Sequence, residues 1–145
     1  MARADSKSPH ETVGYALKQA QQALRLHMDR ELKEVWLTAP QYAVLSSLEA
    51  ESGLSNAMLA RQAFVTPQTM QVMLVKLERA GLIERTPDEV HGRIQRTTLT
   101  SAGSAALKKA HEVGQSSERL VVEVLGADHA SEVKRLLNKI AERLR

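Results

Sequence analysis

Cysteine is absent from the 145-residue chain, and aromatic residues make up only 3% of it. The absence of cysteine excludes disulfides, thiolate metal ligands, cysteine nucleophiles and thiol-based redox sensing. Long apolar runs are also lacking, since none approaches the roughly 18 residues of a membrane span. The amino-terminal stretch has no apolar core of a secretory signal. We therefore expect a cytoplasmic protein with an aliphatic core and no membrane association.

Patterns typical of catalysis or metal binding are also lacking. The seven glycines stand singly, so the chain has no glycine-rich phosphate loop. No motif pairs a nucleophile with a base or one carboxylate with another. The histidines do not show the i, i+4 spacing of a helical metal-binding pair; they are His10, His27, His91, His111 and His129. We therefore expect neither an enzyme nor a metal or cofactor site.

The charge balance is mildly basic. The formal net charge is +3 and the sequence pI is about 9.4. Lysine and arginine are spread along the chain rather than gathered in one run, so composition permits nucleic-acid binding without requiring it. The length is that of a single domain.

Helical periodicity begins near the amino terminus. Apolar residues three and four apart predict one amphipathic helix over 9–36, about 40 Å long at 1.5 Å per residue. Trp36 ends this apolar stripe and is expected in the core. Thr38 and Gln41 form a capping box that starts a second helix, which runs to about residue 51. Residues 1–7 are expected to be disordered.

Two further helices are predicted after Thr100. The first runs to Gly126, with a possible bend at Gly114 and the serines that follow it, and Asp128 caps the second. The last helix is expected to bury its apolar stripe, which consists of Val133, Leu136, Leu137, Ile140 and Leu144. The terminal helices carry more apolar surface than one small domain can cover.

The middle of the chain predicts two helices joined by a short turn. Ser55 caps a helix that ends near residue 62, and Thr66 with Pro67 starts a second helix that Gly81 ends. The outward residues of the second helix are Gln68, Thr69, Gln71, Val72, Lys76 and Arg79. An exposed face of this composition is also typical of an ordinary solvated helix.

A basic hairpin follows directly. The stretch "RTPDEVHGRIQRTTLT", residues 85–100, joins two strand-like runs through turn-forming residues. Helix, turn, helix and hairpin in this order predict a winged helix-turn-helix, whose second helix enters the DNA major groove. Arg93 beside the turn is the candidate for the minor groove. Arg96 either contacts phosphate or pairs with Glu84 or Asp88.

Each candidate residue of the two helices and the hairpin has an expected type of DNA contact. Glutamine can pair with adenine through both ends of its amide, so Gln68 and Gln71, with Val72, are expected to face bases. Phosphate contacts are expected around the start of the second helix, where free N–H groups attract anions. The residues expected at phosphates are Thr66, Thr69, Lys76 and, in one alternative, Arg96, and Ser55 and Pro67 are also expected to contact DNA.

From about residue 10 to the end, the sequence resembles the MarR family of bacterial winged-helix regulators. The resemblance rests on "LTAPQYAVLSSL", "GLSNAMLARQAFVTPQTMQVMLVKLERAGLIERT" and "LTSAG". It implies a mainly α-helical fold with a small β-hairpin wing. It also implies a homodimer in which helices of 1–36 and 101–145 from two chains intertwine, while 38–100 form the DNA-binding lobe. The implied function is a repressor that binds a palindromic site.

The wing departs from the family pattern at one position. The family usually has Asp-x-Arg eight residues before the Leu-Thr of the next helix. Here Arg93 keeps the arginine, whereas His91 replaces the aspartate that would orient it. Protonation of His91 would repel Arg93, so we expect the DNA affinity to depend on pH.

The resemblance further implies a small phenolic or lipophilic effector bound between the dimer helices and the lobe. The ring-bearing candidates are Tyr15, His27, Trp36 and Tyr42. The alternative to the whole interpretation is a winged-helix module that binds a protein partner and has no DNA readout.

Overall fold

The computed structural model describes residues 8–145, so the expectation for residues 1–7 lies outside it. The chain is mainly helical with one small sheet, as predicted. In chain order the elements are η1 (Pro9–Glu11), α1 (Val13–Leu32), η2 (Lys33–Val35), α2 (Ala39–Ala50), β1 (Leu54–Ser55), α3 (Asn56–Gln62), α4 (Pro67–Arg79), β2 (Ile83–Pro87), β3 (Gln95–Leu99), α5 (Ser101–Leu125) and α6 (Ala127–Leu144).

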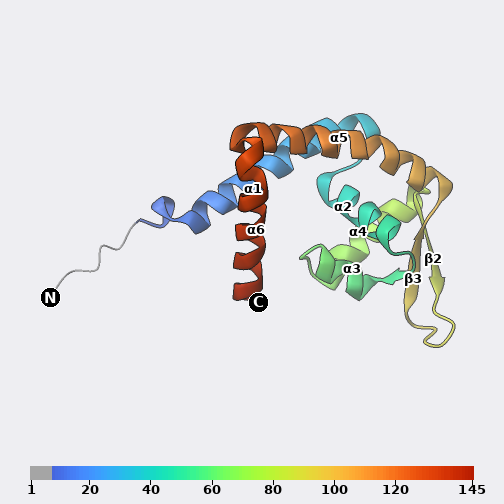
Figure 1. Cartoon of the computed structure of the whole chain (residues 1–145). Coiled ribbons are helices and arrows are strands. Elements are labelled where there is room, and N and C mark those ends of the chain that lie inside the picture. Colours follow the sequence, from blue (N-terminus) through green and yellow to red (C-terminus); the bar gives the residue numbers. More distant parts are fainter. Residues whose placement is uncertain (1–7) are drawn as a thin grey trace.

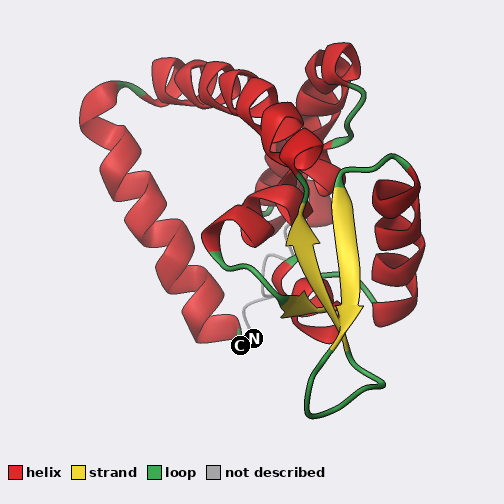
Figure 2. Ribbon diagram, turned by 90° about the vertical axis from the view of Figure 1, so that its right-hand side faces the viewer, coloured by secondary structure: helices red, strands yellow, loops and turns green. Residues whose placement is uncertain are grey.

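The long helix α5 connects two parts of the molecule. It runs beside α1, with α2, α3, α4 and the sheet gathered below one of its ends. From its other end α6 turns back at a steep angle (Figure 1), and its main contacts among residues 8–145 are with α5. The loop of the β2–β3 hairpin projects beyond the rest of the lobe (Figure 2). The hairpin is therefore free to act as a wing.

The sheet has three antiparallel strands in the order β1-β3-β2. The predicted hairpin is confirmed, with Ile83 opposite Leu99 and Pro87 opposite Gln95. The two-residue strand β1 was not predicted, because two residues are too few to show a period. It places Leu54 opposite Thr97 and so fixes the start of α3 against the wing.

One continuous apolar core fills the lobe and reaches α1 and α5. Burial of such aliphatic side chains is the main stabilising contribution. Leu32 and Leu107, from α1 and α5, are both fully buried. The remaining buried apolar residues are Leu37, Val44, Leu45, Leu48, Leu54, Leu59, Ala60, Met70, Leu74, Leu77, Ile83 and Ala110.

The predicted single helix over 9–36 is wrong in its boundaries. Thr12 has an extended backbone, and its side-chain oxygen accepts the N–H of Tyr15 at 3.1 Å, which starts α1 at Val13. The helix ends at Leu32 and tightens into η2. The Thr12 cap therefore sets the start of the helix, although the apolar period continues on both sides of Thr12.

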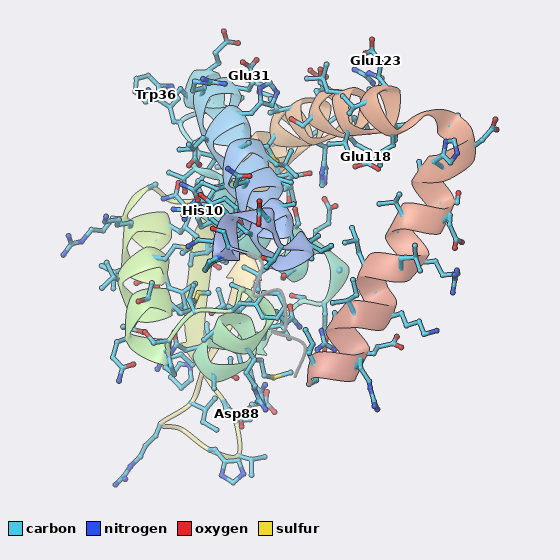
Figure 3. All side chains as sticks on the ribbon, turned by 90° about the vertical axis from the view of Figure 1, so that its left-hand side faces the viewer. His10, Glu31, Trp36, Asp88, Glu118 and Glu123 are labelled. Carbon is cyan, nitrogen blue, oxygen red and sulfur yellow. The ribbon has the colours of Figure 1, made fainter. Side chains whose placement is uncertain are left out.

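The expectation that Trp36 lies in the core is also wrong. Trp36 takes a left-handed backbone (φ 60°) and its side chain is 92% exposed. Figure 3 shows it at the end of the molecule opposite Asp88 in the wing. This conformation turns the chain so that the next residue, Leu37, enters the core with only 3% exposure.

Three carboxy-terminal details differ from the sequence prediction. Helix α5 continues through Gly114 without interruption. Helix α6 begins after Gly126, and Asp128 lies in its first turn without capping it. No residue of α6 is fully buried in the single chain, because among residues 8–145 its apolar stripe is covered only in part by the end of α5. Among residues 8–145, no helix is sufficiently long and apolar to span a membrane.

Candidate nucleic-acid interface

The start of α4 is shaped by its capping residues. The Thr66 side-chain oxygen accepts the N–H of Thr69 at 3.1 Å, and the two hydroxyls lie 3.0 Å apart. Pro67 occupies the first turn. Asn56 at the start of α3 donates from Nδ2 to the Pro67 carbonyl at 3.1 Å, so it fixes α3 to α4. The exposed start of a 13-residue helix is thereby available to an anion.

Helix α4 has one buried face and one exposed face, as predicted. Leu74 is fully buried, with Met70 and Leu77 one turn to either side. Val72 on the opposite face is 58% exposed, an unusual value for valine in a helix of this lobe. The predicted contact residues of α4 are all exposed, namely Pro67, Gln68, Thr69, Gln71, Val72 and Lys76.

The turn between α3 and α4 contains an aromatic residue that sequence reasoning did not single out. Phe64 has a left-handed backbone (φ 56°) and is 84% exposed. This conformation costs a non-glycine residue about 1–2 kcal/mol. It redirects the chain so that Val65 packs against the core and Thr66 caps α4. A turn this tight predicts one residue with a left-handed backbone, but a phenylalanine does not indicate that it is the residue in that conformation.

A second feature that the sequence did not reveal joins the wing to α4. Arg85 of β2 donates from Nε and Nη2 to the two carboxylate oxygens of Glu78, at 3.2 and 3.0 Å. Its Nη1 donates to Gln71 Oε1 at 3.1 Å. The hydrogen bond from Arg85 holds the pKa of Glu78 below its usual value. The contact pairs residues 14 positions apart in sequence, so only the fold reveals it.

Asp88 organises the wing loop. Its Oδ1 accepts the N–H groups of Val90 and His91, each at 2.9 Å, and its Oδ2 accepts Nε of Arg96 at 2.6 Å. These bonds, that of the His91 N–H first, lower the pKa of Asp88 from 3.8 to about 2. Asp88 lies where the loop leaves the sheet (Figure 3). The loop is therefore closed by a carboxylate three residues before the position where the family pattern has one.

The two arginines after the loop have different environments. Arg96 takes the pairing alternative: besides Asp88 it meets the Gly53 carbonyl, with Nη1 at 3.3 Å. Arg93 is exposed and makes no hydrogen bond or ion pair with any residue of 8–145. Of the two, Arg93 is the one available to a ligand at the wing.

Several predicted contact residues share one cleft of about 370 Å³ between α3, α4 and the wing. Ser55 lies on its wall and caps α3, where its oxygen accepts the Met58 N–H at 3.3 Å. Gln71 and Arg93 approach from α4 and from the wing. The fold thus brings together residues up to 38 positions apart, since Ser55 and Arg93 line the same space.

The four candidate effector residues are not gathered in one place. Tyr42 of α2 is hydrogen-bonded to His111 Nδ1 of α5 at 2.9 Å. Tyr15 stacks edge-on against His10 with ring centroids 4.6 Å apart. Five surface cavities of about 370 to 750 Å³ among residues 8–145 are lined by residues other than Tyr15, His27, Trp36 and Tyr42. Residues 8–145 contain no cluster of three or more metal-ligating side chains.

The Tyr42–His111 bond continues to a third residue. His111 Nε2 lies 2.9 Å from Glu49 Oε1, so one imidazole bridges two side chains of α2. Gly114, one turn further along α5, leaves the space that the Tyr42 hydroxyl occupies. This cluster fixes the lobe to the long helix.

Comparisons with known proteins agree with this geometry. Residues 37–94 match the family model described as MarR family. The HTH-type transcriptional repressor Rv2887 of Mycobacterium tuberculosis is 38% identical over 128 residues, which cover 88% of this chain and 92% of the relative.

Two solved structures share the fold over most of their length. The transcriptional repressor CouR, bound to a 23-mer DNA duplex, is 29% identical, with a TM-score of 0.86 and coverage of 97% of this chain and 99% of that one. Rv2887 in complex with p-aminosalicylic acid is 36% identical, with a TM-score of 0.74 and coverage of 90% and 98%. The chain belongs to the MarR family.

Proposed function

We propose that the chain is a transcriptional repressor that binds a pseudo-palindromic DNA site as a homodimer. The observation that carries this is the cleft shared by Gln71 and Arg93, which lies between the exposed face of α4 and the wing. When a helix lies in the major groove and an arginine lies in the adjacent minor groove, one DNA strand runs between them. The cleft lies where that strand would run.

The residues have distinct roles in this proposal. Gln68, Gln71 and Val72 face bases, and the exposed start of α4 at Thr66 receives a phosphate. Arg93 enters the minor groove. The remaining phosphate contacts come from Thr69 and Lys76, while Ser55 and Pro67 lie at the same interface. Arg96 positions the wing, because Asp88 already holds its guanidinium.

A second copy of the chain covers the apolar surfaces of the terminal helices. A groove of about 710 Å³ lies between the end of α5 and α6, with Val121, Val133 and Leu137 on its walls. Leu136 and Ile140 of α6 remain 43% and 38% exposed. We assign 8–36 and 101–145 to dimerisation and 38–100 to DNA binding, within one domain.

A small phenolic or lipophilic effector would release the protein from DNA. The relative Rv2887 binds p-aminosalicylic acid in its solved structure. An effector that binds one arrangement of the two lobes better than the other would shift the population between them. We place the protein in the cytoplasm and assign it no catalytic activity, because its family consists of transcriptional regulators.

Selection of duplexes from a random pool at about 0.15 M salt tests the proposal. We expect a pseudo-palindrome with half-sites about one helical turn apart. Affinity for it should fall steeply with salt. A well-folded dimer that enriches no sequence would contradict the proposal and favour a protein-binding winged-helix module.

Two lysine variants sharpen this experiment. Lys76→Ala should weaken binding to all duplexes alike and reduce the salt slope by about one unit, because it removes one phosphate contact. Lys108→Ala removes the same charge from an exposed position of α5 and should leave both unchanged. Equal effects of the two variants would show that Lys76 does not contact DNA.

A further inference from the structure

We infer that Arg85 sets the base preference of Gln71, by holding the amide oxygen and leaving the amide nitrogen for the DNA. The inference rests on the proposed function, since it concerns the base that this side chain reads. Gln71 is exposed on α4 next to Val72, and its Oε1 accepts Nη1 of Arg85 at 3.1 Å.

The orientation of the amide follows from the chemistry of its partner. A guanidinium group has five N–H donors and no acceptor. It can therefore meet only the oxygen of the Gln71 amide and never the NH₂ group. The Gln71 Nε2 atom has no hydrogen-bond partner among the described residues, so its two donors remain for a ligand.

Arg85 is itself held firmly. Its side chain is only 13% exposed, and the two Glu78 carboxylate oxygens accept its Nε and Nη2. A two-pronged pair of this kind is well defined in geometry. Glu78 lies two turns after Gln71 on the same helix, so one guanidinium contacts both side chains. The Glu78 contact keeps Arg85 in place when the Gln71 side chain moves away from the wing.

The consequence concerns the major-groove edges of the bases. There guanine presents two acceptors, O6 and N7, and thymine presents one, O4, whereas adenine presents the single acceptor N7 beside an amino donor and cytosine presents an amino donor. Pairing with adenine through both ends of an amide requires the oxygen to face the adenine amino group, whereas the Gln71 oxygen is held toward Arg85 on the wing and has one of its two lone pairs in that bond. Gln71 therefore donates from Nε2 preferentially to guanine, which offers both O6 and N7, rather than to thymine or adenine, which each offer one acceptor. Our expectation from the sequence that Gln71 pairs with adenine is replaced by this one.

The test begins with the unaltered protein and its selected duplex. The base position whose preference disappears in Gln71→Ala is the one that Gln71 reads. At that position we expect guanine on the contacted strand, preferred about tenfold over adenine or cytosine. Preference for adenine would overturn the inference while leaving the proposed function intact. Failure to enrich any duplex would overturn both.

Two variants then separate the role of Arg85 from general stabilisation. Arg85→Met keeps the apolar stem and removes the donors, so the amide can turn over and the preference should shift toward adenine. Gln71→Glu, a surface change, leaves only acceptors and should shift the preference to adenine or cytosine. Retention of the original base by either variant, in protein that is folded by circular dichroism, would contradict the inference.

A matched control removes a charge from the same helix. Arg79 lies exposed in the last turn of α4 and has no hydrogen bond to Gln71. Arg79→Met should lower the affinity for all duplexes to the same extent, or leave it unchanged, with the base preference retained. A changed preference in Arg79→Met would mean that the loss of charge, and not the Arg85 contact, governs readout.

Discussion

The lobe and the last helix use the same residue type in opposite ways. Leu45 and Leu74 of the lobe are fully buried, whereas Leu137 and Leu144 of α6 are 41% and 81% exposed. All four lie on helices with an apolar stripe. The lobe therefore completes its own core, while α6 presents an exposed stripe that our proposal assigns to contact with a second chain.

Helix α5 shows the transition between the two regions along its own length. Its first half buries Gly103, Leu107 and Ala110 against the lobe. Towards its end Val124 is 88% exposed. One long helix thus joins the proposed DNA-binding surface to the proposed dimer surface, so in the proposed dimer the pairing of the chains would set the spacing of the two lobes.

The largest expected effect is on the apolar stripe of α6. Leu137→Glu would place a carboxylate in the dimer interface, and burying an unpaired charge is far more costly than exposing it. We expect monomers by sedimentation at micromolar concentration and loss of operator binding. Leu45→Ala in the lobe should instead cost about 3 kcal/mol of unfolding free energy and leave the dimer intact. A Leu137→Glu variant that stays dimeric would remove the contrast between the regions.

The next effect concerns the contact between α2 and α5. A Cβ atom at Gly114 would lie 2.5 Å from the Tyr42 hydroxyl oxygen. Gly114→Ala should therefore lower the free energy of unfolding by about 1–3 kcal/mol through overpacking. Gly92→Ala, where an added Cβ meets nothing within 4 Å, is the matched control and should be nearly neutral. Thermal unfolding of both variants distinguishes them, and similar melting temperatures would contradict the placement of Tyr42.

A smaller effect is expected at the wing. The pKa of Asp88 is lowered from 3.8 to about 2, so its ionised form stabilises the folded chain above the unfolded pKa. This stabilisation is lost as the pH falls through about 2. Asp88→Asn should reduce the melting temperature by a constant amount above about pH 5, and the difference should shrink at lower pH. A difference independent of pH would show that the carboxylate charge has no part in holding the wing.

The smallest effect is a gain in stability. Trp36 has a left-handed backbone and few contacts, since it is 92% exposed. Trp36→Gly should raise the unfolding free energy by about 0.5–1 kcal/mol, because glycine relieves more strain than it costs in chain entropy. Trp36→Ala keeps the strain and should give no gain. If both variants are destabilised in the dimer, the Trp36 ring packs against the second chain.

Local signals made the lobe predictable from sequence. The Thr66 cap with Pro67 and the Thr38–Gln41 capping box each act within four residues, and both appear as predicted. The hairpin is equally local. The polar face of α4 followed from the helical period, because the buried residues recur every three or four positions.

Distant contacts could not be predicted in the same way. The Arg85–Gln71 bond joins residues that no pattern connects, and it changes what Gln71 offers to DNA. The replacement of the family aspartate by His91 removes the carboxylate that would orient Arg93, yet Asp88 closes the loop from outside the motif. Trp36 is exposed because its own backbone is left-handed, and the apolar stripe that ends at Trp36 gave no indication of that conformation.

The mass of the complex with the selected duplex, measured by native mass spectrometry, tests the central claim most directly. Our account predicts two chains on one pseudo-palindromic duplex, with no stable complex of one chain at similar concentration. A single chain bound to the full site with undiminished affinity would contradict it, because the exposed stripe of α6 would then have another purpose.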